Sequence, residues 1–367
     1  MRIDKITLTW VRVPLVEPFR ISSGAVAEKD GIVVEVASDG LRGYGESSPM
    51  AGSFYSSDTP ESCWNALTAS IAPAAVGRQF ESLDAASSWL DALPAANFAK
   101  VGVETALWDL EAQRRGMPLH KLLGGQRNEA ESGLAIGLYD DTADMLRAIE
   151  RHMAEGYRRV KIKIERGRDV ELVRAARKAF GDIPLMVDAN GDYTLEHVSI
   201  FQQLDEFGLM MYEQPFAGSM LAELAQLQGM VCTPVCLDES LETVADVRRA
   251  IELKALRIAN IKIQRVGGFR NALEVYRMCR DAGLGIWVGT MPELGIGCAQ
   301  GAALATLEGC TFPTDVESSL RWFTGDIVDP LIAVDRGMLR APSASGLGYR
   351  VDPARLERYH VAKWESQ

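Results

Sequence analysis

Five short apolar runs, each ending in a charged residue, recur along the middle of the chain: VKIK (160–163), PLMVD (184–188), GLMMYE (208–213), PVCLD (234–238) and RIANIK (257–262). Their last residues lie 25, 25, 25 and 24 positions apart. A step of this size accommodates one strand, one helix and two turns, which is the repeat of a (β/α) barrel. In such a barrel the carboxyl ends of successive strands meet at one mouth, so these five charged side chains are expected to converge there.

The sequence before these runs has a different pattern. Residues 1–50 alternate as an antiparallel sheet would, and residues 60–124 have helical spacing. Because 367 residues exceed one typical core, a barrel plus a second domain is the natural division. Barrel strands are predicted near residues 133–138, 158–164, 184–188, 208–213, 234–238, 257–262, 285–289 and 311–315.

Composition and charge narrow the class of protein. The net charge is −11 without a basic stripe, which argues against a nucleic-acid partner. No apolar stretch approaches the 18 residues of a membrane span, and the start of the chain is charged and alternating rather than signal-like. We therefore expect a soluble cytoplasmic protein without a membrane partner. Barrels of this type commonly assemble, so we expect a homo-oligomer.

Three of the five charged residues are carboxylates on neighbouring strands: Asp188, Glu213 and Asp238. Three hard oxygen ligands, with no histidine or thiolate among them, suit Mg²⁺, with Mn²⁺ as the alternative. Asp is also favoured where a strand turns into a helix, so independent helix N-caps are the other interpretation. The shared register of the three residues favours the metal site.

Lysines stand on either side of the carboxylates. Lys161 and Lys163 lie two residues apart on one strand and so share a face, and Lys262 ends a strand half a circumference away. Two bases on opposite sides of one carbon are what racemisation by deprotonation and reprotonation needs, and a divalent cation would make a proton next to a carboxylate easier to remove. A Schiff-base aldolase using Lys262 is an alternative, but it leaves the carboxylates unexplained.

The ordered set Lys161-x-Lys163, Asp188-x-Asn190, Glu213-Gln214-Pro215, Asp238-Glu239-Ser240 and Lys262 resembles the enolase superfamily, and within it the muconate lactonizing enzyme subgroup. The branch it resembles is that of o-succinylbenzoate synthase and N-acylamino acid racemase. That likeness runs nearly end to end and includes PLVEPFRISSG (14–24), GYGESSPMAGSFYSS (43–57), NIKIQRVGG (260–268) and APSASGLGYRV (341–351).

The resemblance implies a fold and a division into domains. The expected fold is α/β, a modified (β/α)7β TIM barrel with an α+β N-terminal capping domain. Residues 1–125 would form the capping (lid) domain and residues 126–328 the barrel that carries the catalytic site. Residues 329–367 would return to the capping domain.

The resemblance also implies roles for individual residues. Lys163 and Lys262 would be the catalytic acid and base, and Asp188, Glu213 and Asp238 would bind Mg²⁺. Lys161 would lower the pKa of Lys163 and help hold the substrate carboxylate, while Asn190 and Glu239 would orient the ligands and lysines. Substrate specificity is expected to depend on the lid and on the last two strand ends, through Phe19, Ser22, Tyr55, Met291, Glu293, Asp315 and Glu317.

The expected reaction is abstraction of a proton α to the carboxylate of a small substrate. We expect a racemase or epimerase of N-acyl amino acids, or dehydration of the o-succinylbenzoate synthase type. Asp315-x-Glu317 approximates the Asp-x-Asp with which dipeptide epimerases bind a free ammonium, and the Gly289-Thr290-Met291 start is like that of cycloisomerases. Both activities therefore stay open as alternatives, as does an inactive homologue that binds a small acid.

Overall fold

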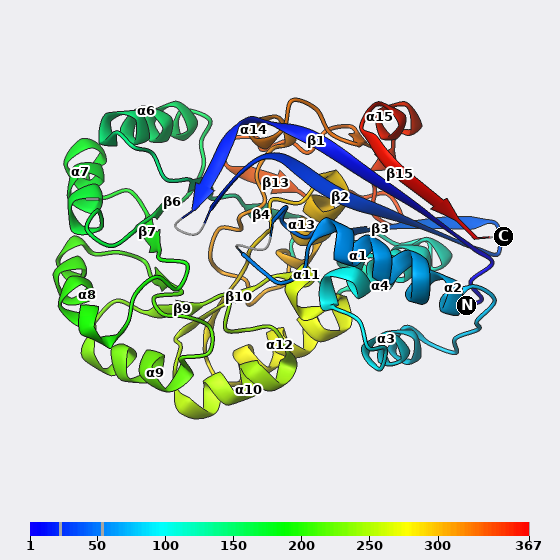
Figure 1. Cartoon of the computed structure of the whole chain (residues 1–367), viewed down its shortest axis with the longest axis horizontal. Helices are drawn as coiled ribbons and strands as arrows, with labels where there is room; N and C mark the ends of the chain where they lie inside the picture. The colour runs from blue at the N-terminus through cyan, green and yellow to red at the C-terminus, as the bar shows by residue number, and fades with distance from the viewer. Residues whose placement is uncertain (22–23, 53–54, 367) are drawn as a thin grey trace.

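The computed structural model describes residues 1–21, 24–52 and 55–366 (Figure 1). Its centre is a curled sheet of seven parallel strands in the order β5-β6-β7-β8-β9-β10-β11. Each strand is paired with its sequence neighbour, so the carboxyl ends all lie at one edge. The strands are β5 (Leu134–Ile136), β6 (Val160–Lys163), β7 (Leu185–Asp188), β8 (Tyr212–Glu213), β9 (Val235–Leu237), β10 (Ile258–Ile261) and β11 (Gly285–Val288).

The predicted eighth strand at 311–315 is wrong as a regular strand. That segment makes only isolated bridges, from Cys310 to Ile286 and from Thr314 to Ser132. Pro313 interrupts it, and proline has no backbone N–H to donate to a ladder. Thr314 N nevertheless donates to Glu131 O at 2.8 Å. The barrel is therefore closed between β11 and β5 by irregular backbone, which confirms the α/β barrel while shortening its last strand.

Helices cover the outside of the barrel, as the arc of α6 to α10 in Figure 1 shows. Several begin at side-chain caps that satisfy free backbone N–H groups, among them Asp141 for α6 and Thr243 for α10. The barrel helices are α6 (Thr142–Met153), α7 (Val170–Phe180), α8 (Val198–Leu204), α9 (Leu221–Met230), α10 (Val244–Leu253), α11 (Ile263–Val266), α12 (Phe269–Asp281), α13 (Gly295–Leu304) and α14 (Ser319–Trp322).

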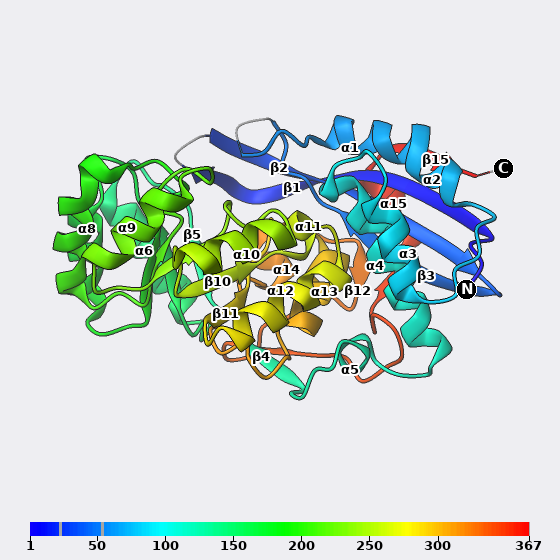
Figure 2. The same cartoon turned by 90° about the horizontal axis from the view of Figure 1, so that it is seen from below.

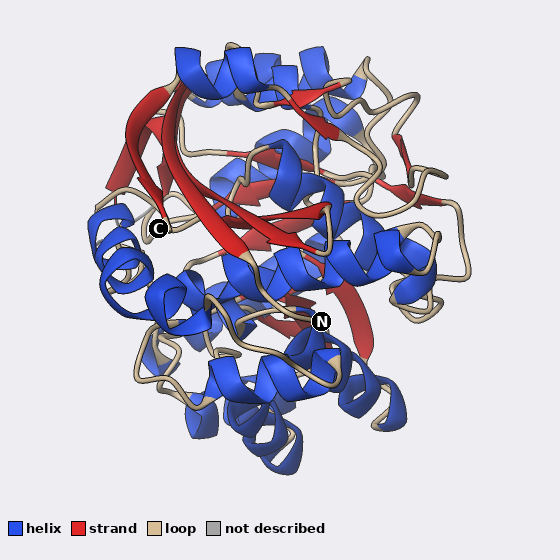
Figure 3. Cartoon of the chain, turned by 90° about the vertical axis from the view of Figure 1, so that its right-hand side faces the viewer, coloured by secondary structure: helices blue, strands red, loops and turns tan. Residues whose placement is uncertain are grey.

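The capping part is an antiparallel sheet with helices against it. Its strand order is β15-β1-β2-β3, so the last strand of the chain pairs with the first. Figure 2 shows β1 and β2 running above the barrel, and Figure 3 shows long curved strands in red with helices beside them. The strands are β1 (Lys5–Ile21), β2 (Gly24–Ser38), β3 (Leu41–Ser47) and β15 (His360–Glu365); the helices are α1 (Pro60–Ala66), α2 (Ala72–Ala75), α3 (Leu83–Asp91), α4 (Asn97–Arg114) and α5 (Leu119–Leu122).

Helix α4 packs directly on β3 because two glycines leave room for it. A Cβ at Gly45 would lie 1.9 Å from the carbonyl oxygen of Gly102, and one at Gly43 would lie 2.3 Å from that of Ala106. Any larger side chain at these positions would push the helix away from the sheet. The run GLRGYGE at 40–46 thus sets the thickness of the capping layer.

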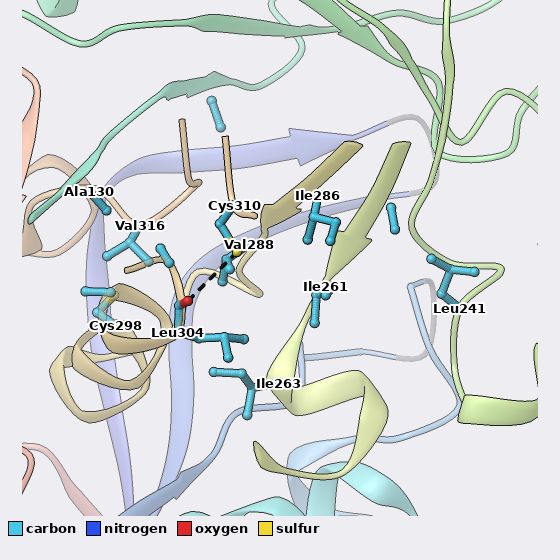
Figure 4. Packing of buried hydrophobic residues seen from close by; sticks show 14 of the residues in the cluster. Ala130, Leu241, Ile261, Ile263, Ile286, Val288, Cys298, Leu304, Cys310 and Val316 are labelled. Atoms are coloured by element: carbon cyan, nitrogen blue, oxygen red, sulfur yellow. Dashed lines mark hydrogen bonds between the residues drawn. The ribbon is translucent and has the colours of Figure 1, made fainter. Parts of the chain in front are cut away.

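Short elements and one large apolar cluster complete the molecule. Figure 4 shows Ile286, Val288, Leu304, Cys310 and Val316 in this cluster, where β11 meets the closing segment and α13. Within the described residues, no helix combines the length and hydropathy that crossing a bilayer requires. The remaining short elements are β4 (Glu129–Glu131), β12 (Val328–Asp329), β13 (Met338–Arg340), β14 (Arg350–Val351), α15 (Pro353–Arg358), the π-helix η1 (Leu67–Ile71) and the 3-10 helices η2 (Leu195–His197) and η3 (Asp205–Phe207).

Two buried glutamates of the capping part, here called the interface carboxylates, join it to the barrel. Glu46 of β3 accepts hydrogen bonds from the backbone N of Leu294 at 2.8 Å and of Gly297 at 2.9 Å. Glu104 of α4 accepts from the backbone N of Phe269 at 2.8 Å. Each carboxylate therefore caps the start of a barrel helix, α13 or α12, and fixes the capping layer over the mouth.

Candidate active site

The strand register brings the predicted site residues together at the mouth of the barrel. Lys163 of β6 is the lateral partner of Asp188 on β7, which is the partner of Glu213 on β8. Asp238 directly follows β9, and Lys262 directly follows β10. The three carboxylates, here called the rim carboxylates, are each at most 1% exposed. Burying an arc of charged side chains next to one another costs free energy unless each is paired with an opposite charge.

Lys163 sits at one end of this arc. Its Nζ donates to Asp188 Oδ2 at 2.6 Å and to Asn190 Oδ1 at 2.9 Å. The amide of Asn190 in turn donates from Nδ2 to Glu239 Oε1 at 2.9 Å. The structure thus brings together Lys163, Asn190 and Glu239 in one row of hydrogen bonds.

Lys262 sits at the other end of the arc, beneath the capping layer. Its Nζ donates to Asp238 Oδ2 at 2.8 Å and to the hydroxyl of Tyr55 at 3.0 Å. Arg265 donates to the other oxygen of Asp238 and to the same hydroxyl. Burial would raise the pKa of Asp238, but attraction to Arg265 and Lys262 outweighs it and lowers that pKa overall. Asp238 is therefore held as a carboxylate.

Lys161 lies between the two ends, beneath the rim. Its Nζ is 3.2 Å from Glu213 Oε2 and 3.8 Å from Asp188 Oδ2, and it also donates to Asp315. Burial would lower the pKa of Lys161, but Asp315 and Glu213 attract the ammonium and raise that pKa well above its ordinary value. Lys161 is consequently a fixed positive charge under the mouth.

Glu213 is the member of the rim whose hydrogen bonding is incomplete. Oε1 accepts from Asn260 Nδ2 at 2.8 Å, whereas Oε2 accepts no hydrogen bond in the described part of the chain. Burial, together with repulsion from Asp188, raises the pKa of Glu213 to about 8. A buried carboxylate oxygen without a hydrogen bond is costly as an anion; Lys161 Nζ, 3.2 Å from Oε2, offsets part of that cost, and a metal cation at Oε2 would offset more of it.

The donor set fits a hard divalent cation, although it is not gathered into a ready cage. Among residues 1–21, 24–52 and 55–366, no three Asp, Glu, His or Cys side chains already converge as a metal-binding group. The reason is visible in the contacts: Asp188 and Asp238 each pair with a nearby lysine, and Asp238 also pairs with Arg265. These cationic side chains already balance the negative charge of the carboxylates that a Mg²⁺ ion would otherwise balance.

A partly open pocket, here called the chamber, lies at the mouth of the barrel and is covered on one side by the capping layer. All three lysines line it, together with Met50 of the capping part and Trp322 of α14. Phe19 packs edge-on against Trp322, with ring centroids 4.9 Å apart, and forms one wall. Of the predicted specificity residues, those that line the chamber are Phe19, Tyr55, Met291 and Asp315.

The other predicted specificity residues lie elsewhere. Ser22 falls outside the described residues. Glu293 is buried beside the capping layer, where it accepts from the backbone N of Met291 at 3.0 Å. Glu317 accepts from the backbone N of Ala135 at 2.9 Å and lies 3.4 Å from Arg321. Neither of these two glutamates lines the chamber.

Asp315 is already paired within the barrel. It accepts hydrogen bonds from Arg159 and Lys161, and both partners are nearly fully buried. Burial would raise the pKa of Asp315, but these cations lower it to about 2. Asp315 and Glu317 are thus both engaged with cations of the protein itself.

Sequence reasoning missed three polar residues beneath the site, although each left a periodic signal. Arg265 follows Lys262 by three residues, which is about one helical turn. Asn260 precedes Lys262 by two residues and so lies on the same face of the strand. Arg159 lies two residues before Lys161 on the lysine face and stacks over Trp287 at 5.0 Å.

The chain matches known proteins along nearly its whole length. The family model described as "Mandelate racemase / muconate lactonizing enzyme, N-terminal domain" matches residues 4–124, and that described as "Enolase C-terminal domain-like" matches residues 144–355. The chain is 41% identical over 360 residues to an o-succinylbenzoate synthase of Geobacillus stearothermophilus, covering 98% of this chain and 96% of that one. It is 36% identical over 365 residues to an N-succinylamino acid racemase of Thermus thermophilus, covering 100% and 98%.

A solved structure gives the same result. A member of the enolase superfamily from Listeria innocua superposes with a TM-score of 0.95 at 32% identity, covering 100% of this chain and 99% of that one. These matches confirm the resemblance stated from the sequence motifs.

Proposed function

The chain belongs to the enolase superfamily, in the family of mandelate racemase and muconate lactonizing enzyme, and from this premise we propose that it is a Mg²⁺-dependent racemase of N-acyl amino acids. The observation that carries the proposal is the placement of Lys163 and Lys262 at opposite ends of the rim, both lining one chamber. A substrate carbon held between them has one base on each face, which is what inversion at that carbon requires.

The rim carboxylates are the proposed magnesium ligands. Members of the superfamily depend on Mg²⁺, and Asp188, Glu213 and Asp238 offer the oxygen donors that this ion prefers. Oε2 of Glu213, which lies 3.2 Å from Lys161 Nζ but accepts no hydrogen bond in the described residues, supports this assignment. When bound, the ion would offset the negative charge that develops on the substrate carboxylate as the α-proton leaves.

Each residue of the site has its own proposed role in the reaction. Lys163, as the neutral amine, removes the proton from one face, and Asn190, tied to Glu239, fixes the direction of its amino group. Lys262 returns a proton to the opposite face, aimed by the hydroxyl of Tyr55. Lys161 is a permanent cation under the mouth and holds the substrate carboxylate. The capping layer excludes water from the chamber.

The chamber favours substrates whose amino group is blocked. A free ammonium would need an unpaired carboxylate, but Asp315 is paired with Arg159 and Lys161, and Glu317 lies outside the chamber. An amide nitrogen carries no charge and needs no such partner. N-acyl amino acids are therefore the proposed substrate class, in preference to dipeptides.

A second candidate is formation of o-succinylbenzoate, favoured by the 41% identity to a synthase of that name. The same first step would serve: Lys163 would remove the α-proton, and Lys262 would stabilise the charge that develops as hydroxide leaves. Both reactions need the lysine pair and the rim, so they differ only in the step after proton removal.

Proton exchange in D₂O, followed by NMR, tests the proposal. The purified enzyme with Mg²⁺ is incubated with N-succinyl and N-acetyl amino acids and with L,L-dipeptides, and Lys163→Ala and Lys262→Ala are compared with the exposed-lysine control Lys178→Ala. Exchange with inversion of an N-acyl substrate is expected for the wild type and the control, and none for the two site variants. Exchange that persists in both site variants would overturn the mechanism.

A parallel assay separates the two candidates. The wild type is given the hydroxylated precursor of o-succinylbenzoate, and the aromatic product is followed by absorbance. Rapid product formation without exchange of any N-acyl amino acid would replace the racemase by the synthase. Exchange of N-acyl amino acids without aromatic product would exclude the synthase.

A further inference from the structure

A buried lysine of the capping part, Lys29 on β2, reaches the loops on two sides of the chamber. It is 5% exposed, and its Nζ donates to the carbonyl oxygens of Ser48 at 3.0 Å, Pro49 at 2.9 Å and Met291 at 3.5 Å. An ammonium group has three N–H donors, and here three backbone carbonyls from two distant segments receive them.

These contacts distinguish Lys29 from a lysine of an ion pair. Within the described residues, Lys29 forms no salt bridge with a carboxylate, although Glu46 and Glu293 are close enough to attract its charge. Burying an ammonium is costly unless its hydrogen bonds are satisfied. The hydrogen bonds of Lys29 therefore hold the backbone of the two segments and not another side chain.

Each segment carries a methionine into the chamber. Met50 directly follows Pro49, and Met291 is itself a partner of Lys29; both side chains line the chamber and are nearly fully buried. Met50 belongs to the capping part and Met291 to the loop after β11. Lys29 thus fixes the spacing of two apolar walls that come from different parts of the molecule.

We propose that Lys29 is a positioning residue for substrate specificity, setting the fit of the amino-acid side chain between Met50 and Met291. This inference rests on the proposed function and deepens it. Lys29 does not line the chamber and so does not touch the reacting atoms. Its loss should change which side chains are accepted more than the chemistry of the α-carbon, because a difference of one methylene in an apolar pocket already changes discrimination by about tenfold or more.

The test compares Lys29→Met with Lys100→Met. Lys100 is the matched control: it is also a buried lysine of the capping part, 6% exposed, and its Nζ donates to a backbone carbonyl, that of Asp91 at 3.0 Å. It does not line the chamber. kcat and KM are measured for N-succinyl derivatives of alanine, valine and phenylalanine. The ratio of kcat/KM between the largest and smallest side chains is expected to change about tenfold in Lys29→Met and to stay as in the wild type in Lys100→Met.

A second measurement does not depend on the reaction. Hydrogen–deuterium exchange of the free protein should accelerate at residues 48–52 and 289–291 in Lys29→Met and at neither segment in Lys100→Met. If Lys29→Met does not fold, Lys29→Gln, which keeps two N–H donors on a shorter side chain, replaces it in both measurements.

The outcomes separate this inference from the proposed function. Unchanged selectivity in an active Lys29 variant, or an equal change in Lys100→Met, would overturn the positioning role. If the wild type processes no N-acyl substrate, the proposed function fails. In that case unaltered hydrogen exchange at both segments would still show that Lys29 does not hold them.

Discussion

The rim carboxylates and the interface carboxylates are equally buried but are bonded in different ways. Glu104 accepts from the backbone N of Phe269 and Arg270 and from the side chains of Ser87 and Trp108, at distances from 2.8 to 3.1 Å. Glu213, by contrast, has one oxygen without a hydrogen bond in the described residues. Burial raises the pKa of both glutamates, so burial does not distinguish them; their donors do.

The difference separates a structural carboxylate from one available to a ligand. Backbone N–H groups at a helix start cannot leave, so a carboxylate bonded to them is committed to holding that helix. Lysine ammonium groups such as those of Lys163 and Lys262 can be exchanged for another cation without breaking secondary structure. The same substitution, glutamate to glutamine, should therefore have opposite consequences in the two places.

The largest effect is expected at the rim, from Glu213→Gln. A neutral amide cannot balance a divalent cation, so α-proton exchange on the best substrate should fall at least about 100-fold. Added Mg²⁺ should stabilise the wild type against unfolding, by about 2.7 kcal/mol at 100 times its Kd, and should not stabilise the variant. NMR exchange assays and thermal unfolding with and without Mg²⁺ measure the two effects.

The metal-free variant provides the control for this prediction. Because burial and repulsion from Asp188 raise the pKa of Glu213, the neutral side chain is favoured in the absence of metal, and glutamine reproduces that neutral form. The metal-free unfolding temperature should therefore match that of the wild type at neutral pH. A large drop would mean that Glu213 is a structural residue and that the comparison fails.

A smaller effect, on stability and not on activity, is expected from Glu104→Gln at the interface. Two backbone N–H groups at the start of α12 each donate to one oxygen of Glu104. Glutamine has only one such oxygen, so at least one of these backbone N–H groups loses its acceptor. The free energy of unfolding should fall by roughly 1–3 kcal/mol. Proton exchange at saturating Mg²⁺ should be retained, since Glu104 does not line the chamber.

Denaturant unfolding and exchange assays on the same samples check this prediction. The exposed residue Glu81 supplies the matched substitution, Glu81→Gln, which should leave both properties unchanged. Loss of activity in Glu104→Gln without loss of stability would mean that the interface carboxylates act on the site directly.

The same contrast explains which features the sequence could predict. The five charged strand ends were placed from spacing alone, because parallel strands in one register bring residues at equal steps to one edge. The helix caps made by Glu46 and Glu104 join residues 248 and 165 positions apart, and no local pattern marks them. The irregular closing segment had a local signal in Pro313, which has no backbone N–H to donate to a strand ladder.

The pairing of Asp315 marks another limit of the sequence. Its position at a predicted strand end suggested contact with substrate, and it does line the chamber. Its two cationic partners, Arg159 and Lys161, come from β6 and the residue before it, across the closure of the barrel. Which of several nearby charges a buried carboxylate pairs with depends on side-chain geometry, and residue spacing does not contain that information.

The narrowest effect, confined to the pH dependence of stability, is expected at Glu293, which lies near Glu46 and, like the rim carboxylates, is buried beside another carboxylate. Burial, together with repulsion from Glu46, raises the pKa of Glu293 to about 7. An unfolded glutamate has a pKa of about 4.3, so between these values the folded protein holds a proton that the unfolded chain has lost. The stabilisation is thus complete below about pH 4.3 and is lost as the pH rises to about 7.

Glu293→Gln should remove this contribution to the pH dependence, because an amide does not titrate. The free energy of unfolding of the wild type should fall relative to that of the variant as the pH rises through this window, by at most about 1.4 kcal/mol for each pH unit. Denaturant unfolding of both proteins from about pH 4 to about pH 8 measures the difference. A difference that stays constant across the window would mean that Glu293 does not gain a proton on folding, and would contradict the raised pKa on which this prediction rests.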